Sequence, residues 1–270
     1  MPLDSEGENT VGSARTVLSA FSEEETQALL QEVPSVYRSQ INDALLAALA
    51  EAFARWTGSP SLLIDLEGHG REEIVSGIDL SRTVGWFTTR FPVLLELPES
   101  ASSGERLIAV KEQLRAIPQR GIGYGILRYL GDGTHARNRW KSLPEPAVSF
   151  NYLGQLDRLL PEDSIFRVLP SVGPPRSARD RRRHLIAVDG KVVGGRLRFA
   201  WIYSENLHRR ATIERLAEGF EQALRALVSH CRSADAGRYT PSDFPKARLS
   251  QRDLEKLVAG MKTADPGLPR

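Results

Sequence analysis

The sequence predicts a mixed α/β fold, in which helices pack against a mixed β-sheet. Apolar residues recur at helical spacing in some segments and alternate with polar residues in others, which is the period of a strand. These helical and strand patterns do not alternate strictly along the chain, which argues against a doubly wound dinucleotide-binding fold. The segments that carry the patterns most clearly are residues 39–56, 103–117 and 212–231 for helices, and 62–67, 147–153 and 197–203 for strands.

The composition is that of an ordinary globular protein of the reducing cytoplasm. The chain has 270 residues, of which 41% are hydrophobic and 26% charged, and its net charge of +2 gives no reason to expect nucleic acid or a membrane as a partner. Its single cysteine, Cys231, excludes a disulfide framework and lies in a helical pattern, where a small apolar residue is the usual role. We therefore expect a cytoplasmic protein.

Three regions are expected along the chain. Residues 1–16 are acidic, polar and rich in glycine, unlike a signal peptide, and predict a flexible leader. Residues 17–232 carry the helix and strand patterns and predict the folded domain. Residues 233–270 predict an extended segment with a short helix and a linker.

The first helix is expected after Ser22, which forms a capping box with Glu25, and is expected to end before Pro34. A second helix over residues 39–56 is ended by Gly58. The elements expected next are a strand ending at Glu67 and β-rich segments at 82–88 and 91–97, where Pro92 indicates a sheet edge or the start of a strand. A helix at 103–117 and a strand at 147–153 follow.

The last third of the chain predicts a hairpin followed by a long helix. Asp189-Gly190 between two apolar runs is a strong turn signal, so we expect strands at 184–188 and 191–193. A half-buried strand follows at 197–203, and Thr212 is expected to cap a helix that reaches Cys231. Residues 233–249 are expected to be extended, with a short helix from Ser250.

The stretch from Asp65 to Glu72 gathers ionisable side chains around two glycines, at the end of an apolar strand. Alternation along the strand points Leu66 to the core and Glu67 to the opposite face, so the strand runs out of the core into a cleft. Binding and catalytic groups often lie at such strand ends. Spacing alone leaves the alternative open that Glu67 is a surface carboxylate paired with Arg71 or Arg82.

Other motifs give weaker signals. Gly121-x-Gly-x-Gly125 follows a helix and lacks the dinucleotide spacing, so we expect a tight turn with close backbone packing instead of a nucleotide site. The arginines of residues 176–183 could bind an acidic partner, although a solvated loop is the more frequent role of such a cluster. The histidines show no zinc-ligand spacing, and we expect no metal site.

Five stretches of the chain carry a recognisable set of motifs. They are Asn42–Ala48, Glu67–Glu72, Arg82–Pro92, Pro118–Gly125 and Phe150–Asp157. In this order, they resemble the later signature motifs of the epimerization domains of nonribosomal peptide synthetases, which belong to the condensation-domain superfamily with its chloramphenicol and CoA-dependent acyltransferase-like fold. The resemblance runs from about Val17 to Leu257, and the versions of the second and fifth motifs favour epimerization over peptide-bond-forming condensation.

The sequence departs from this family at one motif. Epimerization domains carry a His-His-x-x-x-Asp-Gly motif in their N-terminal half, and no two histidines are adjacent in this chain. The resemblance therefore implies the C-terminal subdomain of such a domain, inactive without the half that carries the motif. The given chain would then be a fragment, a truncated reading frame or one piece of a split enzyme.

The resemblance implies inversion of the α-carbon, L to D, of an aminoacyl or peptidyl thioester. The substrate would be held on the phosphopantetheine arm of a peptidyl carrier protein, with no cofactor bound by this chain. Glu67 would be the acid/base of this half, which suits a carboxylate whose pKa is raised by burial or a neighbour. Asn151, Tyr152 and His69 are expected to line the site, and Arg71, Glu72, Arg82 and Trp86 to support it.

The expected partners are the carrier protein, the N-terminal half and neighbouring synthetase modules. Two alternatives remain: a non-catalytic fragment that docks carrier proteins, and a half-domain that catalyses condensation. Because a domain divided along its cleft exposes apolar surface, we also expect the chain to associate with itself or with an N-terminal half.

Overall fold

A computed structural model describes residues 1–72, 74–130, 143–158, 176–233, 236–247 and 249–264 of the chain. Its centre is a six-stranded mixed sheet with the strand order β1-β6-β5-β4-β2-β3. Strand β4 pairs in parallel with β2 and β5, whereas the other neighbours are antiparallel. The strands are β1 (Ala14–Ala20), β2 (Ser61–Gly68), β3 (Thr89–Glu96), β4 (Val148–Gln155), β5 (Ile186–Val193) and β6 (Arg196–Ser204). The predicted mixed sheet with packed helices is confirmed.

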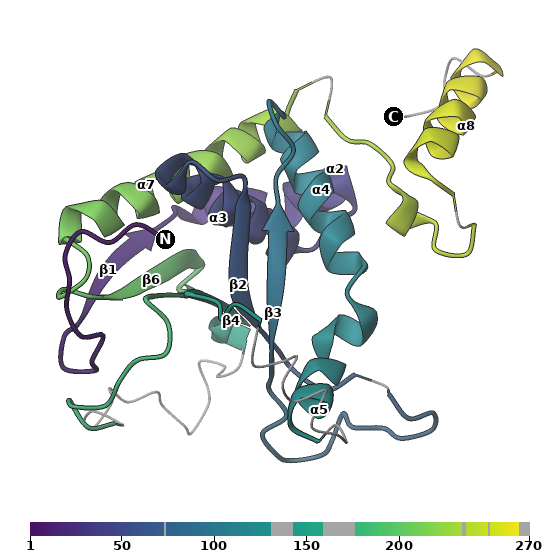
Figure 1. Cartoon of the computed structure of the whole chain (residues 1–270). Helices are drawn as coiled ribbons and strands as arrows, with labels where there is room; N and C mark the ends of the chain where they lie inside the picture. Colours follow the sequence, from purple (N-terminus) through teal and green to yellow (C-terminus); the bar gives the residue numbers. More distant parts are fainter. Residues whose placement is uncertain (73, 131–142, 159–175, 234–235, 248, 265–270) are drawn as a thin grey trace.

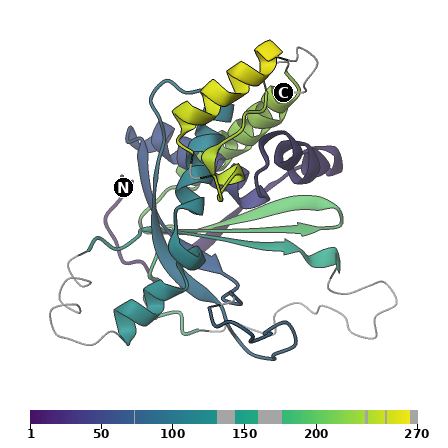
Figure 2. The same cartoon turned by 90° about the vertical axis from the view of Figure 1, so that its right-hand side faces the viewer.

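The longest helices lie on one side of this sheet (Figures 1 and 2). They bury the apolar residues of every second strand position, including Ile64, Phe150 and Trp201, against Leu49 and Phe220. The helices are α1 (Glu23–Gln27), η1 (Ala28–Glu32), α2 (Val33–Tyr37), α3 (Ile41–Thr57), α4 (Ser103–Arg115), η2 (Pro118–Gly121), α5 (Gly123–Tyr129), η3 (Leu156–Arg158), α7 (Arg210–Cys231), η4 (Pro241–Asp243) and α8 (Gln251–Ala264). The other face of the sheet therefore carries the polar half of the strand pattern.

Most expected elements are present, and several ends differ. The Ser22 capping box with Glu25 is confirmed, as is the left-handed cap at Gly58, where φ is 73°. The first helical region does not end before Pro34, since a π-helical turn at Ala28–Glu32 leads directly into α2. Pro34 lies at the start of α2, directly after the π-helical turn. Helix α7 starts at Arg210, so Thr212 lies inside the helix and does not cap it.

Two strand predictions are wrong. The segment 82–88 is not a strand, and β3 begins only at Thr89, although Pro92 does lie on the edge strand of the sheet. The Asp189-Gly190 pair is not a turn: β5 runs through it, and the hairpin instead turns at Gly194 and Gly195, which have φ of 60° and 68°. A tertiary contact decides this, because the ring of Phe199 fills the space that a Cβ at position 190 would take.

The glycines 121–125 combine the expected close packing with a helix. Gly121 has φ of 80°, and a Cβ there would overlap the ring of Phe91. Gly123 and Gly125 belong to α5 and have open space around them. The end of the expected linker, residues 265–270, lies outside the described residues.

The N-terminal segment that was expected to be a flexible leader makes hydrogen bonds to the body of the domain. The backbone N–H of Asp4 donates to the carbonyl of Leu207 over 2.9 Å, and its carboxylate accepts from the N–H of Arg209 over 2.8 Å. Further along, the side-chain amide of Asn9 donates to the carbonyls of Arg182 and His184. In the part of the chain that the structure describes, no helix is both long and apolar enough to cross a membrane.

Candidate functional site

The candidate site lies on the sheet face opposite the long helices. Leu62, Ile64 and Leu66 of β2 are buried on the helix side, so the alternating positions Asp65 and Glu67 face the other way. A hollow of about 730 Å³ opens there between the end of β2, the start of β3 and α5. Asp65, Glu67, Trp86, Arg90, Tyr124, Tyr129 and Arg183 are among its lining residues. The expectation that β2 ends in a cleft is confirmed.

Glu67 is held on two sides by donors from the neighbouring strands. One carboxylate oxygen pairs with the guanidinium of Arg90 on β3, and the other accepts a 2.9 Å hydrogen bond from the side-chain amide of Asn151 on β4. The side chain of Glu67 is about four-fifths buried, with 20% exposed. Glu67 therefore forms its ion pair with Arg90. The alternative from the sequence, a surface carboxylate paired with Arg71 or Arg82, named the wrong partners. The arrangement fixes one carboxylate at the mouth of a hollow.

A second carboxylate, Asp65, lies deeper on the same strand. It is 2% exposed and is 2.7 Å from Nε2 of His184, with the guanidinium of Arg183 3.8 Å away. A buried carboxylate needs such partners, because an unpaired buried charge is strongly destabilising. In the sequence, strand alternation places Asp65 on the same face of the strand as Glu67. Nothing in the neighbouring sequence indicates that His184, 119 residues further along the chain, is its partner.

His69, Arg71 and Glu72 lie beyond the end of β2 and form a separate cluster. The strand ends at Gly68, so His69 does not share the strand face with Glu67; its side chain is 59% exposed and lies 3.2 Å from Glu72. Arg71 donates to the carbonyls of Leu80 and Thr83 over 2.7 and 2.8 Å. These contacts organise the loop before β3.

The remaining predicted residues are dispersed. Trp86 lines the hollow and is 90% exposed, whereas Arg82 is exposed on the preceding loop. Tyr152 alternates away from Asn151 and packs against the core, where burial raises the pKa of its phenol. The structure thus places Glu67 and Trp86 on the hollow and Asn151 beside Glu67, whereas His69 and Tyr152 do not line the hollow.

Reasoning from the sequence missed Arg90, the ion-pair partner of Glu67, and Asp189, which lies one strand beyond Asn151. Arg90 was one residue of a motif without an assigned role, and its pairing appears only when β3 folds back beside β2. Asp189 was assigned to a turn, whereas in the middle of β5 it lies beside Asn151. The signal that could have found Asp189 was the unbroken alternation from Ile186 to Val192, which a turn would have interrupted.

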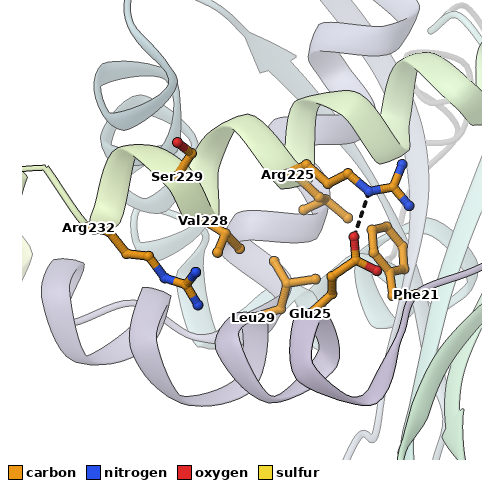
Figure 3. A pocket seen from close by; sticks show the side chains of 8 residues that line it. Phe21, Glu25, Leu29, Arg225, Val228, Ser229 and Arg232 are labelled. Carbon is orange, nitrogen blue, oxygen red and sulfur yellow. Dashed lines mark hydrogen bonds and ion pairs between the residues drawn. The ribbon is translucent and has the colours of Figure 1, made fainter.

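A smaller hollow of about 260 Å³ lies on the helical side, between the first helices and α7 (Figure 3). Its arginines are already paired, Arg225 with Glu25 and Arg232 with Glu32. These pairs fasten α7 to the first helices, and the apolar floor of Phe21 and Leu29 belongs to the core. Among the described residues, no group of three or more histidine, cysteine, aspartate or glutamate side chains is arranged to hold a metal ion.

Comparison with protein families matches residues 2–250 to the Condensation domain. One of the proteins that make up the linear gramicidin synthase of Brevibacillus parabrevis is 49% identical over 252 residues, which are 93% of this chain and 3% of that protein. Chondramide synthase cmdD of Chondromyces crocatus is 48% identical over 261 residues, 96% of this chain and 6% of that protein. The chain therefore spans a small part of the curated relatives it matches.

Among solved structures, the epimerization domain from the third module of tyrocidine synthetase B is similar, with a TM-score of 0.77 and 33% sequence identity. The match covers 86% of this chain and 51% of that domain. A cyclization-docking bidomain from Sorangium cellulosum, at 15% identity and a TM-score of 0.60, shares the fold; that match covers 84% of this chain and 44% of the bidomain. The predicted acyltransferase-like fold is confirmed.

Proposed function

Since this chain belongs to the Condensation domain family, we propose that it is the C-terminal part of an epimerization domain that inverts the α-carbon of a carrier-bound aminoacyl or peptidyl thioester. The similarity to the tyrocidine synthetase epimerization domain, which covers about half of that domain, supports this assignment. The N-terminal half with its His-His motif and a phosphopantetheine carrier protein are the partners that the proposal requires.

The observation that carries the proposal is the position of Glu67. Its carboxylate lies at the mouth of a hollow, fixed from both sides by Arg90 and Asn151. Epimerization requires removal of the α-proton from one face of the carbon and return of a proton to the other, and a positioned carboxylate can do either.

The experiment is α-proton exchange in a reconstituted domain. The chain is combined with an N-terminal half that carries the His-His motif, and an L-aminoacyl carrier protein is incubated in deuterated water. We expect deuterium at the α-carbon and accumulation of the D-isomer, and a loss of about 10²–10⁴-fold in the exchange rate with Glu67→Gln. The matched control is Glu214→Gln, which makes the same chemical change at an exposed position of α7, away from the hollow.

Three results would contradict the proposal. Exchange that survives Glu67→Gln would remove the assigned role of this residue. Peptide-bond formation without exchange would identify a condensation half-domain. Binding of the carrier protein without turnover, with the N-terminal half present, would identify a docking fragment.

A further inference from the structure

The charged groups that line the hollow beside Glu67 are already paired. Glu67 forms an ion pair with Arg90. Asp65 lies 2.7 Å from the ring of His184 and 3.8 Å from the guanidinium of Arg183. The charged side chains among the described lining residues are thus two carboxylates and two guanidiniums, and each has a partner of opposite charge. A charged ligand side chain therefore finds no uncompensated charge on this side of the hollow.

A second side of the hollow is apolar. Trp86, on the loop before β3, lines it together with Ile126, Tyr129 and Leu130, which lie on α5 and at its end. These four residues are called the apolar wall below. Each of them exposes about half of its surface or more. Large apolar side chains that gather around a hollow and remain exposed are typical of a site that binds an apolar group.

The backbone on both sides of Trp86 is anchored. Arg71 donates to the carbonyl of Gly85 over 3.5 Å, and its guanidinium lies over the ring of Phe87, 4.4 Å from the ring centre. The carbonyl of Phe87 lies so close to Gly70 that a Cβ at Gly70 would overlap it. A ligand that packs against the indole of Trp86 therefore has little further chain to order, which lowers the entropic cost of binding.

We propose that the apolar wall takes the side chain of the acyl group, so that the domain prefers aminoacyl or peptidyl thioesters whose residue next to the sulfur is large and apolar or aromatic. This inference rests on the proposed function, because it places the α-carbon beside Glu67. A carboxylate that removes the α-proton must approach that carbon to roughly 3 Å. The side chain on the same carbon then lies inside the hollow, whose volume of about 730 Å³ is within the range of small-molecule sites.

The two sides of the hollow favour one class of side chain over the others. A large apolar side chain removes its own surface and that of the apolar wall from water, which favours binding in proportion to the area buried. An alanine side chain is too short to cover the wall. An aspartate side chain would bring a charge to an apolar surface that offers it no partner.

The N-terminal half is the other group that could cover the apolar wall. Other exposed apolar residues are available to it, because Leu18, Leu94 and Leu153 of the sheet are not among the described residues that line the hollow. The apolar wall instead shares one hollow with Glu67. This placement favours a group attached to the reacting carbon over a packing surface between the two halves.

The first test needs no catalysis. N-acetyl-L-aminoacyl thioesters of N-acetylcysteamine, made with phenylalanine, leucine, alanine or aspartate, are added to the full chain, and NMR follows the indole N–H signal of Trp86, which Trp86→Phe assigns. We expect the phenylalanyl and leucyl thioesters to move this signal at concentrations about tenfold lower than the alanyl and aspartyl thioesters, or lower still. An indole signal that responds equally to all four thioesters, or to none, would overturn the inference.

The matched variants lie next to each other on α5. Ile126→Asn changes the apolar wall and is expected to reduce the preference for the phenylalanyl and leucyl thioesters. Leu127→Asn is the control, because Leu127 is similarly exposed on the same helix but is not among the described residues that line the hollow. It is expected to leave the preference unchanged.

The second test is substrate preference in the reconstituted domain. The ratio kcat/KM for α-proton exchange is measured with phenylalanyl and alanyl carrier protein, and we expect the unsubstituted domain to favour the phenylalanyl carrier by about tenfold or more. Ile126→Asn is expected to lower kcat/KM for the phenylalanyl carrier and to leave the value for the alanyl carrier nearly unchanged. A merely structural role would lower both values equally. Leu127→Asn is again the control.

The possible results separate this inference from the proposed function. Equal kcat/KM values for the two carriers would overturn the inference and leave the proposed function standing. Weaker association of the two halves in Ile126→Asn, with an unchanged substrate preference, would also overturn it and assign the apolar wall to the N-terminal half. Absence of exchange in the unsubstituted domain would contradict the proposed function, while the thioester titration still decides what the apolar wall binds.

Discussion

At the scale of single residues, position 190 shows how closely one side chain can constrain a strand. Gly190 leaves room for Phe199, which in turn packs edge-on against Phe220 with ring centres 4.9 Å apart. The same contact keeps Asp189 in β5 and beside Asn151. A local sequence signal for a turn is therefore overridden by an aromatic cluster.

Gly190→Ala is expected to lower the free energy of unfolding by about 1–3 kcal/mol, since the added Cβ would overlap Phe199 in a packed core. Denaturant titration of the purified chain measures this. Gly123→Ala serves as the control, because nothing lies within 4 Å of a Cβ at that position. Equal stability of the two variants would show that Phe199 moves aside without cost.

His208 gives a pH dependence with a defined sign. It is fully enclosed, with its ring against the edge of Trp56, and burial lowers its pKa despite the nearby charge of Asp4. The unfolded chain then binds a proton more readily than the folded chain, so this contribution to stability is present above about pH 6.5 and is lost as the pH falls toward the lowered pKa.

The expected outcome is a steeper loss of stability in the unsubstituted chain than in His208→Phe as the pH falls below about 6.5. Chemical denaturation at a series of pH values gives both curves. His69→Phe, at an exposed histidine, is the comparison and is expected to retain the steep slope. Parallel curves for the unsubstituted chain and His208→Phe would contradict the assigned sign.

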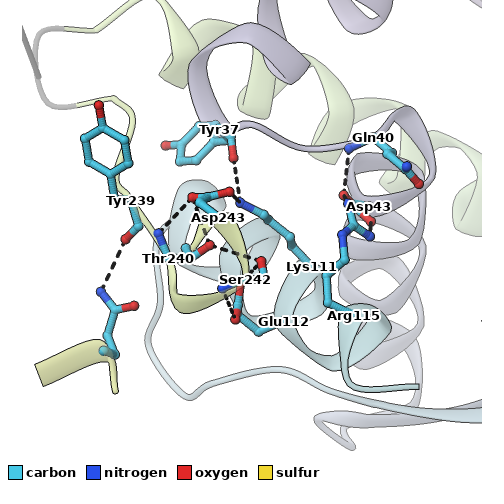
Figure 4. Close-up of polar contacts among 11 residues, drawn as sticks. Tyr37, Gln40, Asp43, Lys111, Glu112, Arg115, Tyr239, Thr240, Ser242 and Asp243 are labelled. Carbon is cyan, nitrogen blue, oxygen red and sulfur yellow. Dashed lines mark hydrogen bonds and ion pairs between the residues drawn. The ribbon is translucent and has the colours of Figure 1, made fainter. Parts of the chain in front are cut away.

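At the scale of elements, the C-terminal segment is fastened to α4 by a buried ion pair (Figure 4). The ammonium of Lys111 donates to Asp243 over 2.6 Å and to the carbonyl of Tyr37 over 3.0 Å, and its side chain is 1% exposed. Beside it, Glu112 accepts from the N–H and the hydroxyl of Ser242. These bonds connect η4 to α2 and α4.

Lys111→Met is expected to release this segment, because a buried carboxylate without its cation is destabilised by about 3–5 kcal/mol and escapes by moving into water. Hydrogen exchange should become faster over residues 239–244 and remain unchanged in the sheet. Lys256→Met, at an exposed position of α8, is the control. Unchanged protection of residues 239–244 in Lys111→Met would show that Ser242 and Glu112 suffice.

At the scale of the whole molecule, the open face of the sheet carries apolar as well as polar side chains. Leu18 on β1 is 77% exposed, and Leu94 on β3 and Leu153 on β4 are each 52% exposed. All three alternate with core positions on their strands, as does Glu67. The hollow and these leucines therefore belong to one face, which is where an N-terminal half would pack in the proposed domain.

The chain is accordingly expected to associate in a concentration-dependent way and to bind an added N-terminal half through this face. Sedimentation velocity over a range of concentrations measures self-association. The double substitution Leu18→Glu with Leu94→Glu is expected to weaken both self-association and binding of the N-terminal half. Leu257→Glu, an equally exposed leucine on α8, should have no effect. A monomer at high concentration that also fails to bind the N-terminal half would contradict this use of the open face.

The sequence by itself determined the fold class, most helices, the alternation of β2 and the place of Glu67 at its end. These depend on patterns of period 3.6 or 2 within short segments, on caps such as Ser22, and on motifs that are contiguous in the chain. The tertiary structure decided what surrounds Glu67. Arg90 and Asn151 come from two other strands, and they become its neighbours only through the pairing and register of the sheet. Likewise, the packing of Phe199 against Gly190 keeps β5 a continuous strand where the Asp-Gly pair predicts a hairpin turn, and that contact joins residues on two different strands.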